Sequence, residues 1–147
     1  LEEKVKDGNF TDTEGNILGR HQGYPFYTIG QRKGLDIALG KPAFVTDIDP
    51  EKNAVTLGDE EALKRPGMLV YKLNWMKYDS FSEEMPAVTK VRYKDNGTPG
   101  HIYSSPVGVK VVFTEPVKGV APGQSAVFYE GDDVIGGGII RESLKEV

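Results

Sequence analysis

One short segment of this 147-residue chain, residues 19–35, combines glycines, aromatic rings and side chains that can bind a ligand. Glycine lets a backbone approach a ligand closely, Arg and Lys bind anions, and aromatic faces stack on nucleic-acid bases. These residue types together indicate a binding surface, with Gln31, Arg32 and Lys33 as its candidate donors. Spacing alone leaves a second interpretation open, a turn-rich connection whose glycines make corners and whose cations are solvated.

A second candidate binding element lies at residues 89–94, which read Thr-Lys-Val-Arg-Tyr-Lys. Side chains alternate along a strand, so an extended segment would place Lys90, Arg92 and Lys94 on one face. Such a face could contact phosphates, with Arg92 able to form bidentate bonds and Tyr93 available where the strand ends. The alternative is a solvated edge strand that its lysines protect from aggregation.

Gln124 is a third candidate, because it follows the turn residues Pro122 and Gly123 at the mouth of an expected strand. An amide in that position could reach outward to read a base edge or a sugar, although a glutamine after a turn is commonly just solvated. The triple glycine at residues 136–138 lacks the Lys-Ser/Thr of a phosphate-binding loop. We therefore expect a β-bulge or a close strand crossing there.

The composition offers little for catalysis. The absence of cysteine excludes disulfides, cysteine zinc sites and thiol nucleophiles, and the two histidines are too far apart in sequence to suggest a metal cluster. His21 could bind a phosphate or act in acid–base chemistry, but it has no nucleophile nearby and we interpret it as structural. We therefore predict no catalytic residue and no metal site in this chain.

Charge is segregated along the chain, although the formal net charge is only −4. Residues 1–18 carry five acids against two lysines, and residues 47–61 carry six acids against one lysine. Residues 20–41 hold four cations and one acid, and residues 86–118 hold five cations and two acids. This arrangement would suit one RNA-binding face on an otherwise anionic protein, but scattered solvated charges fit the same counts.

The elements that would position these residues are mostly β. Hairpins are expected within residues 5–19 and 43–58, with short helical turns at 24–32 and 59–64. Six further strand-like runs, separated by Gly, Pro and Asn-Gly turns, predict an all-β barrel; they cover residues 68–76, 87–93, 101–104, 107–114, 125–130 and 134–141. We therefore predict a mainly β chain with two domains. These are a small central α+β or hairpin domain at residues 1–65 and a six-stranded antiparallel barrel, resembling translation-factor barrels, at residues 66–147.

The motif Gly-x-His-x-Gly, followed by Tyr-Thr-Ile-Gly-Gln-Arg-Lys-Gly-Leu, resembles the signature of the tRNA-specific 2-thiouridylases. The likeness continues through Asn74-Trp75, Lys-Val-Arg-Tyr at 90–93, Ala-Pro-Gly-Gln at 121–124 and the glycine-rich stretch 131–140, and so covers nearly the whole chain. The chain has no Ser-Gly-Gly-Val-Asp-Ser-like ATP loop. It therefore looks like the C-terminal portion of that enzyme without its catalytic domain. Asp36 departs from the family's usual glycine and would weaken phosphate binding there.

The resemblance implies that a missing N-terminal domain binds ATP with Mg, adenylates the C2 oxygen of the wobble uridine and delivers sulfur from a cysteine persulfide. The present portion, which would need no cofactor itself, would position the tRNA by its anticodon arm. The family's tRNA contacts match Arg92, Tyr93 and Gln124, and we add Gln31, Arg32 and Lys33 as weaker candidates. The implied partners are tRNA, a sulfur-relay protein or cysteine desulfurase, and the N-terminal catalytic domain.

A different function remains open, in which this portion is a protein-docking or structural module with little RNA affinity of its own. The acidic stretches at residues 1–18 and 47–61 favour such a module for a sulfur-relay partner or for the catalytic domain. No apolar run approaches the roughly 20 residues that a membrane-spanning helix needs, and the charged start is unlike a secretory signal. We expect a soluble, cytoplasmic protein with no membrane partner.

Overall fold

A computed structural model describes residues 6–35, 40–78, 83–92 and 94–147. The chain divides into two compact units, Leu1–Lys64 and Arg65–Val147. Each unit has a hydrophobic core of its own.

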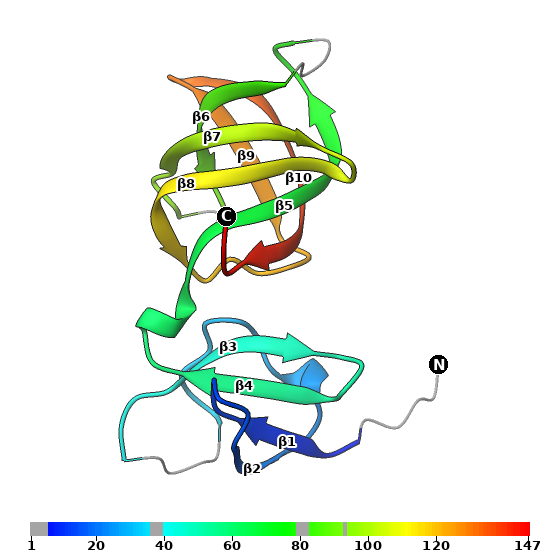
Figure 1. The fold of residues 1–147 in the computed structure, drawn as a ribbon, viewed down its shortest axis with the longest axis vertical. Helices are drawn as coiled ribbons and strands as arrows, with labels where there is room; N and C mark the ends of the chain where they lie inside the picture. The colour runs from blue at the N-terminus through cyan, green and yellow to red at the C-terminus, as the bar shows by residue number, and fades with distance from the viewer. Residues whose placement is uncertain (1–5, 36–39, 79–82, 93) are drawn as a thin grey trace. The chain divides into compact units, whose positions relative to one another are not determined.

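The first unit is a four-stranded sheet in the order β2-β1-β4-β3 (Figure 1). Its strands are β1 (Gly8–Thr11), β2 (Ile17–His21), β3 (Phe44–Asp49) and β4 (Ala54–Gly58), with single 3₁₀ turns η1 (Tyr24–Phe26) and η2 (Glu61–Leu63). Both expected hairpins form, β1 with β2 and β3 with β4. Parallel pairing of β1 with β4 joins the two hairpins into one sheet. Its core contains Phe10, Leu35, Val45, Val55 and Leu57.

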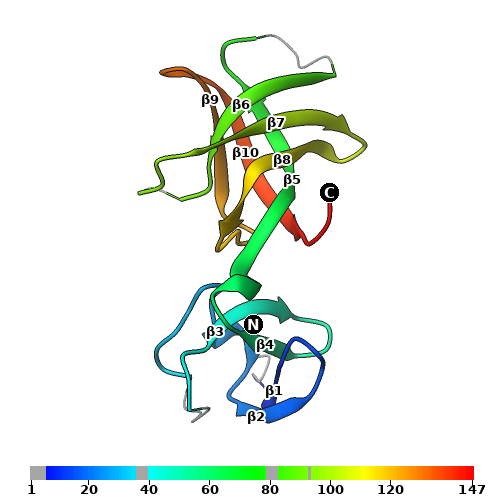
Figure 2. The same ribbon diagram turned by 60° about the vertical axis from the view of Figure 1, so that its left-hand side comes forward.

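The second unit is a closed six-stranded barrel in the order β10-β5-β8-β7-β6-β9 (Figures 1 and 2). Its strands are β5 (Lys64–Trp75), β6 (Glu84–Lys90), β7 (Thr98–Ser105), β8 (Gly108–Lys118), β9 (Ser125–Glu130) and β10 (Asp133–Leu144). Alternate residues point inward, as the buried positions Ala126 and Phe128 of β9 illustrate, and Trp75 stacks on Phe128. The predicted fold class, a small central domain followed by a six-stranded antiparallel barrel, is confirmed.

The triple glycine lies in β10, where the strand is irregular against both of its neighbours. Register shifts occur between Val134 and Gly136 on the β9 side and between Gly137 and Ile139 on the β5 side. A side chain at Gly137 would meet the carbonyl oxygen of Ala126 at 2.6 Å. The expected β-bulge is confirmed, and the backbone of β9 lies close to it.

One expected strand, predicted at residues 87–93, begins and ends earlier than predicted. β6 ends at Lys90, so Arg92 and Lys94 belong to the following turn and do not share a strand face with Lys90. The Asp95 carboxylate causes this, because it accepts hydrogen bonds from the backbone N–H groups of Val91 and Gly97, both at 2.9 Å. The prediction of a three-cation strand face was therefore wrong.

Other strand ends also differ from expectation. β8 continues through Pro116 to Lys118, four residues past its predicted end, and β5 begins at Lys64. Neither of the two short 3₁₀ turns, the helical elements of the described residues, is long and apolar enough to cross a membrane.

Candidate nucleic-acid interface

The side chain of Arg92 is held at one end of the barrel. Its Nη1 donates to the carbonyl oxygen of Lys118 at 2.7 Å and to that of Gly119 at 3.3 Å. A guanidinium has five N–H donors, and within the described part of the chain those on Nε and Nη2 of Arg92 make no hydrogen bond. Arg92 is exposed. One edge of the guanidinium therefore anchors it to the β8–β9 connection, while its other donors are available to an anion.

Gln124 lies at the other end of the same β8–β9 connection. Its carbonyl oxygen accepts a hydrogen bond from the N–H of Ile140 at 2.8 Å, and the N–H of Gly123 donates to the carbonyl oxygen of Ile140 at 2.8 Å. The backbone is thus fixed against β10. The exposed Gln124 side chain makes no hydrogen bond to any described residue.

Strand pairing brings Arg92 and Gln124 to the same end of the barrel. β6 and β9 are antiparallel, with Lys90 opposite Val127 in the last aligned pair. Arg92 follows the end of β6 and Gln124 directly precedes β9, so both residues lie at this end of the barrel. Lys90 adds a cation on the outer face, with its Nζ 4.7 Å from the centre of the Tyr129 ring. We call this end, defined by Lys90, Arg92, Lys94, Lys118 and Gln124, the basic rim.

The predicted partner of Arg92 in RNA binding, Tyr93, lies outside the described residues. Lys94 was considered only as part of the predicted strand face with Lys90 and Arg92. Lys118 was not predicted as a site residue. Lys118 belongs to the rim because its carbonyl oxygen holds Arg92. The contact between Arg92 and Lys118 joins residues 26 positions apart, so no local sequence pattern could have predicted it. The turn that carries Lys94 was predictable from Asp95-Asn96-Gly97.

The central segment is built around a buried histidine. His21 is 3% exposed, and its ring makes edge contacts with Phe10 and Tyr27. Its Nδ1 accepts a hydrogen bond from the N–H of Gly23 at 2.9 Å, so Nε2 carries the proton and donates to the Asn53 carbonyl oxygen at 2.8 Å. Both ring nitrogens are used within the protein. This environment is consistent with the interpretation of His21 as a structural residue, which stays a prediction.

The three candidate residues of the central segment have different environments; they are Gln31, Arg32 and Lys33. The Gln31 side chain accepts a hydrogen bond from the N–H of Thr28 at 3.0 Å and donates one to the carbonyl oxygen of Lys33 at 2.9 Å. Its amide therefore bridges the backbone on both sides of Gln31. Arg32 and Lys33 are exposed, and their side chains make no hydrogen bond or ion pair within the described part of the chain. Two cations are therefore available in this loop, and the glutamine holds its shape.

The central sheet also carries an acidic cleft of about 410 Å³. Asp12, Glu14 and Asp59 line it with a single cation, Lys41, above apolar residues that include Leu57. Hydrogen bonds from the side chain and backbone of Asn16 lower the pKa of Asp12, which keeps its carboxylate charged at neutral pH. A negatively charged cleft repels phosphates and does not suit an RNA contact.

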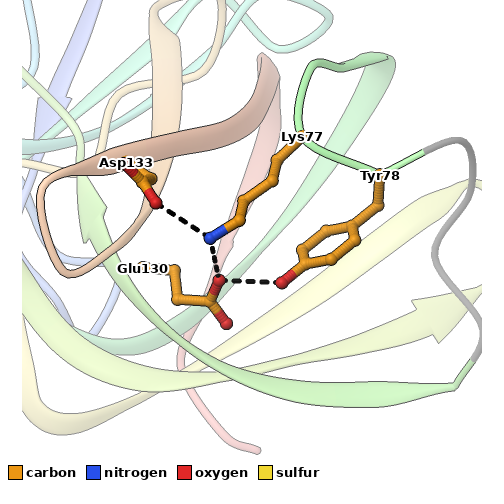
Figure 3. A network of polar contacts seen from close by, with 4 residues as sticks. All are labelled: Lys77, Tyr78, Glu130 and Asp133. Atoms are coloured by element: carbon orange, nitrogen blue, oxygen red, sulfur yellow. Dashed lines mark hydrogen bonds and ion pairs between the residues drawn. The ribbon is translucent and has the colours of Figure 1, made fainter.

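A network of ion pairs and hydrogen bonds lies at the barrel end opposite the basic rim (Figure 3). Lys77 Nζ donates to Glu130 Oε1 at 2.6 Å and to Asp133 Oδ2 at 2.9 Å, and the Tyr78 hydroxyl donates to Glu130 Oε1 at 2.7 Å. The hydrogen bond from Lys77, and then that from Tyr78, lowers the pKa of Glu130, while the bond to Glu130 raises the pKa of Tyr78. These side chains satisfy one another and tie the segment after β5 to the β9–β10 turn.

No group of three or more His, Asp or Glu side chains that could hold a metal ion occurs among the described residues. His101 lies 3.7 Å from Glu84 on the outer wall of the barrel, and both are well exposed.

Comparison with known proteins agrees with this architecture. Residues 2–59 match the family model described as "tRNA methyl transferase PRC-barrel domain", and residues 65–140 match "Aminomethyltransferase beta-barrel domain". The first match covers the open sheet and the second covers the closed barrel. The chain is thus a two-domain β protein that combines these two kinds of domain.

The chain belongs to the tRNA-specific 2-thiouridylase family. It is 53% identical to the tRNA-specific 2-thiouridylase MnmA of Cytophaga hutchinsonii over 99% of this chain and 40% of that protein. It is also 53% identical to the protein of the same name from Amoebophilus asiaticus, over 99% of this chain and 39% of that protein. For the relative from Carboxydothermus hydrogenoformans the identity is 47%, over 97% of this chain and 39% of that protein. The chain therefore spans about two fifths of the length of these relatives.

Proposed function

We propose that this chain is the tRNA-binding portion of a tRNA 2-thiouridylase, and that its basic rim grips the anticodon arm of the substrate tRNA. Sulfur would be placed on C2 of the wobble uridine by a further, N-terminal domain, which would bind ATP with Mg. The chain spans only about 40% of the relatives that carry this enzyme name, which supports such a division of labour.

The observation that carries the proposal is that Arg92 and Gln124 lie at the same end of the barrel, at the two ends of the β8–β9 connection. Arg92 supplies a guanidinium that the Lys118 carbonyl oxygen orients. Gln124 supplies a side-chain amide without a hydrogen-bond partner among the described residues, on a backbone that is hydrogen-bonded to β10. RNA recognition commonly combines Arg contacts to phosphates with amide contacts to base edges or sugars. Arg32 and Lys33 provide a second set of available cations in the central segment.

A salt titration tests this function directly. The 147-residue chain is mixed with a fluorescently labelled anticodon stem-loop RNA, and anisotropy is followed at low and at physiological salt. Phosphate contacts predict an affinity that falls steeply as salt rises, because binding releases condensed counterions. No binding at low salt would contradict the proposal.

The acidic cleft favours a second candidate function, protein docking. A cleft lined by Asp12, Glu14 and Asp59 could receive a basic segment of a sulfur-relay partner, a cysteine desulfurase or the N-terminal catalytic domain. This candidate predicts little RNA affinity in the chain alone, so the same titration separates the two functions.

A further inference from the structure

Arg141 lies on β10 at a position that is not paired with a residue of β5. Ile140 pairs with Val70 and Glu142 pairs with Leu69 of β5, so Arg141 is the extra residue of a β-bulge. On the other side of β10, the aligned pairing with β9 ends at Ile139. A bulge leaves its extra residue outside the regular ladder and redirects its side chain, and such bulges are common at barrel rims.

The side chain of Arg141 is available to solvent. Ile140 is only 1% exposed, whereas Arg141 is exposed. Within the described part of the chain, the Arg141 guanidinium makes no hydrogen bond and no ion pair, including with its exposed neighbour Glu142. The fold thus places an uncommitted cation at a bulge of β10, beyond the point where its aligned pairing with β9 ends.

Arg141 also lies beside the basic rim. Ile140, its neighbour in sequence, is the residue whose backbone holds Gly123 and Gln124. In the closed barrel β9 lies between β6 and β10. Arg92 follows the end of β6, Gln124 directly precedes β9, and Arg141 lies on β10. In the order around the barrel, Gln124 therefore lies between the strand that leads to Arg92 and the strand that carries Arg141.

We infer that Arg141 is a further RNA-contacting residue, which binds a backbone phosphate on the side of Gln124 opposite to Arg92. This inference rests on the proposed function. In this arrangement Gln124 contacts a base or sugar of a single RNA strand. Arg92 and Arg141 bind the phosphates on either side of that nucleotide. Phosphate contacts of this kind fix the register of the nucleic acid.

The test compares Arg141→Ala with Lys110→Ala in anisotropy titrations of the anticodon stem-loop over a salt series. Lys110 lies on β8, three strands from β9 in either direction around the barrel, so its replacement removes one positive charge from the far wall. Arg141→Ala is expected to weaken binding several-fold and to reduce the slope of log affinity against log salt by about one. Lys110→Ala should leave that slope unchanged, and Arg141→Lys should retain it because it keeps the charge.

The outcomes separate the inference from the proposed function. If the unmodified chain binds RNA and Arg92→Ala weakens binding, but Arg141→Ala behaves like Lys110→Ala, Arg141 is not a contact and the proposed function stands. If the unmodified chain binds no RNA at low salt, the proposed function and the inference both fall. Circular dichroism of each variant checks that the barrel remains folded.

Discussion

The guanidinium of Arg92 lies 2.7 Å from the carbonyl oxygen of Lys118, in the connection that leads to Gln124. This hydrogen bond orients the guanidinium and leaves the N–H donors on Nε and Nη2 without a partner among the described residues. We expect Arg92→Ala to weaken RNA binding about tenfold, equivalent to about 1.4 kcal/mol. The variant should lose only about 1 kcal/mol or less of unfolding free energy, because the lost hydrogen bond is exposed. Anisotropy and urea denaturation measure the two effects. A stability loss with unchanged affinity would make Arg92 purely structural.

Gly119 provides an indirect test of the same contact. Its φ of +73° is one that L side chains rarely adopt, and an added Cβ would lie 2.8 Å from Arg92 Nη1. Gly119→Ala should therefore cost about 1 kcal/mol of stability and also displace the guanidinium, which lowers RNA affinity. Gly131→Ala is the matched control, because Gly131 has a φ of +60° with nothing within 4 Å. Equal RNA affinities in the two variants would count against the role of Arg92.

His21 should matter for stability and not for RNA binding by the barrel. His21→Ala would leave the Gly23 N–H and the Asn53 carbonyl oxygen without their partner and would open a cavity beside Phe10. We expect a loss of about 2–4 kcal/mol of unfolding free energy, measured by urea denaturation. A variant as stable as the unmodified chain, but with weaker RNA binding, would show that His21 serves the ligand instead.

Gln31 and its two neighbours should respond differently to substitution. Gln31→Ala removes the amide that bridges Thr28 and Lys33, so it should increase hydrogen exchange in that loop. The double change Arg32→Ala with Lys33→Ala should leave exchange unchanged and reduce the salt dependence of RNA binding, since both cations are exposed. If the double variant binds RNA with the same salt slope as the unmodified chain, the loop makes no phosphate contact.

The network at the opposite barrel end predicts a pH dependence. The pKa of Glu130 is lowered from its ordinary value of 4.5, mainly by Lys77. Its stabilising contribution is therefore present above pH 4.5 and is lost as the pH falls through the lowered pKa. Glu130→Gln should be less stable than the unmodified chain at pH 7, and the difference should shrink in acid. The effect is small because these groups are exposed. A carboxyl NMR titration of Glu130 with no downward shift would contradict this.

Sequence pattern predicted the fold class because the strands of the barrel are locally encoded. Alternation of buried and exposed residues, as in Ser125–Glu130, and turn signals such as Asp95-Asn96-Gly97 need no knowledge of distant contacts. The parallel pairing of β1 with β4 was not predictable in this way, since it joins residues more than 40 positions apart, such as Phe10 and Val55.

The candidate site was only partly predictable for the same reason. Arg92 and Gln124 were identified from residue type and family resemblance, but their location at the same barrel end depends on the antiparallel pairing of β6 with β9. The premature end of β6 depends on the side chain of Asp95, which competes for backbone N–H groups that a strand would use. Arg141 gave no sequence signal, because its exposure follows from a bulge in β10.

The most direct test of the central claim is to locate RNA on the protein by NMR. A ¹⁵N-labelled sample of the chain is titrated with the anticodon stem-loop, and shifts of backbone amides are followed. The account predicts that the largest changes occur at Arg92 and Gln124 of the basic rim and at Gly119, which contacts Arg92. The amides of residues 130–133 at the other barrel end should stay unchanged. Changes confined to the acidic cleft of the central sheet, or to residues 130–133, would contradict it.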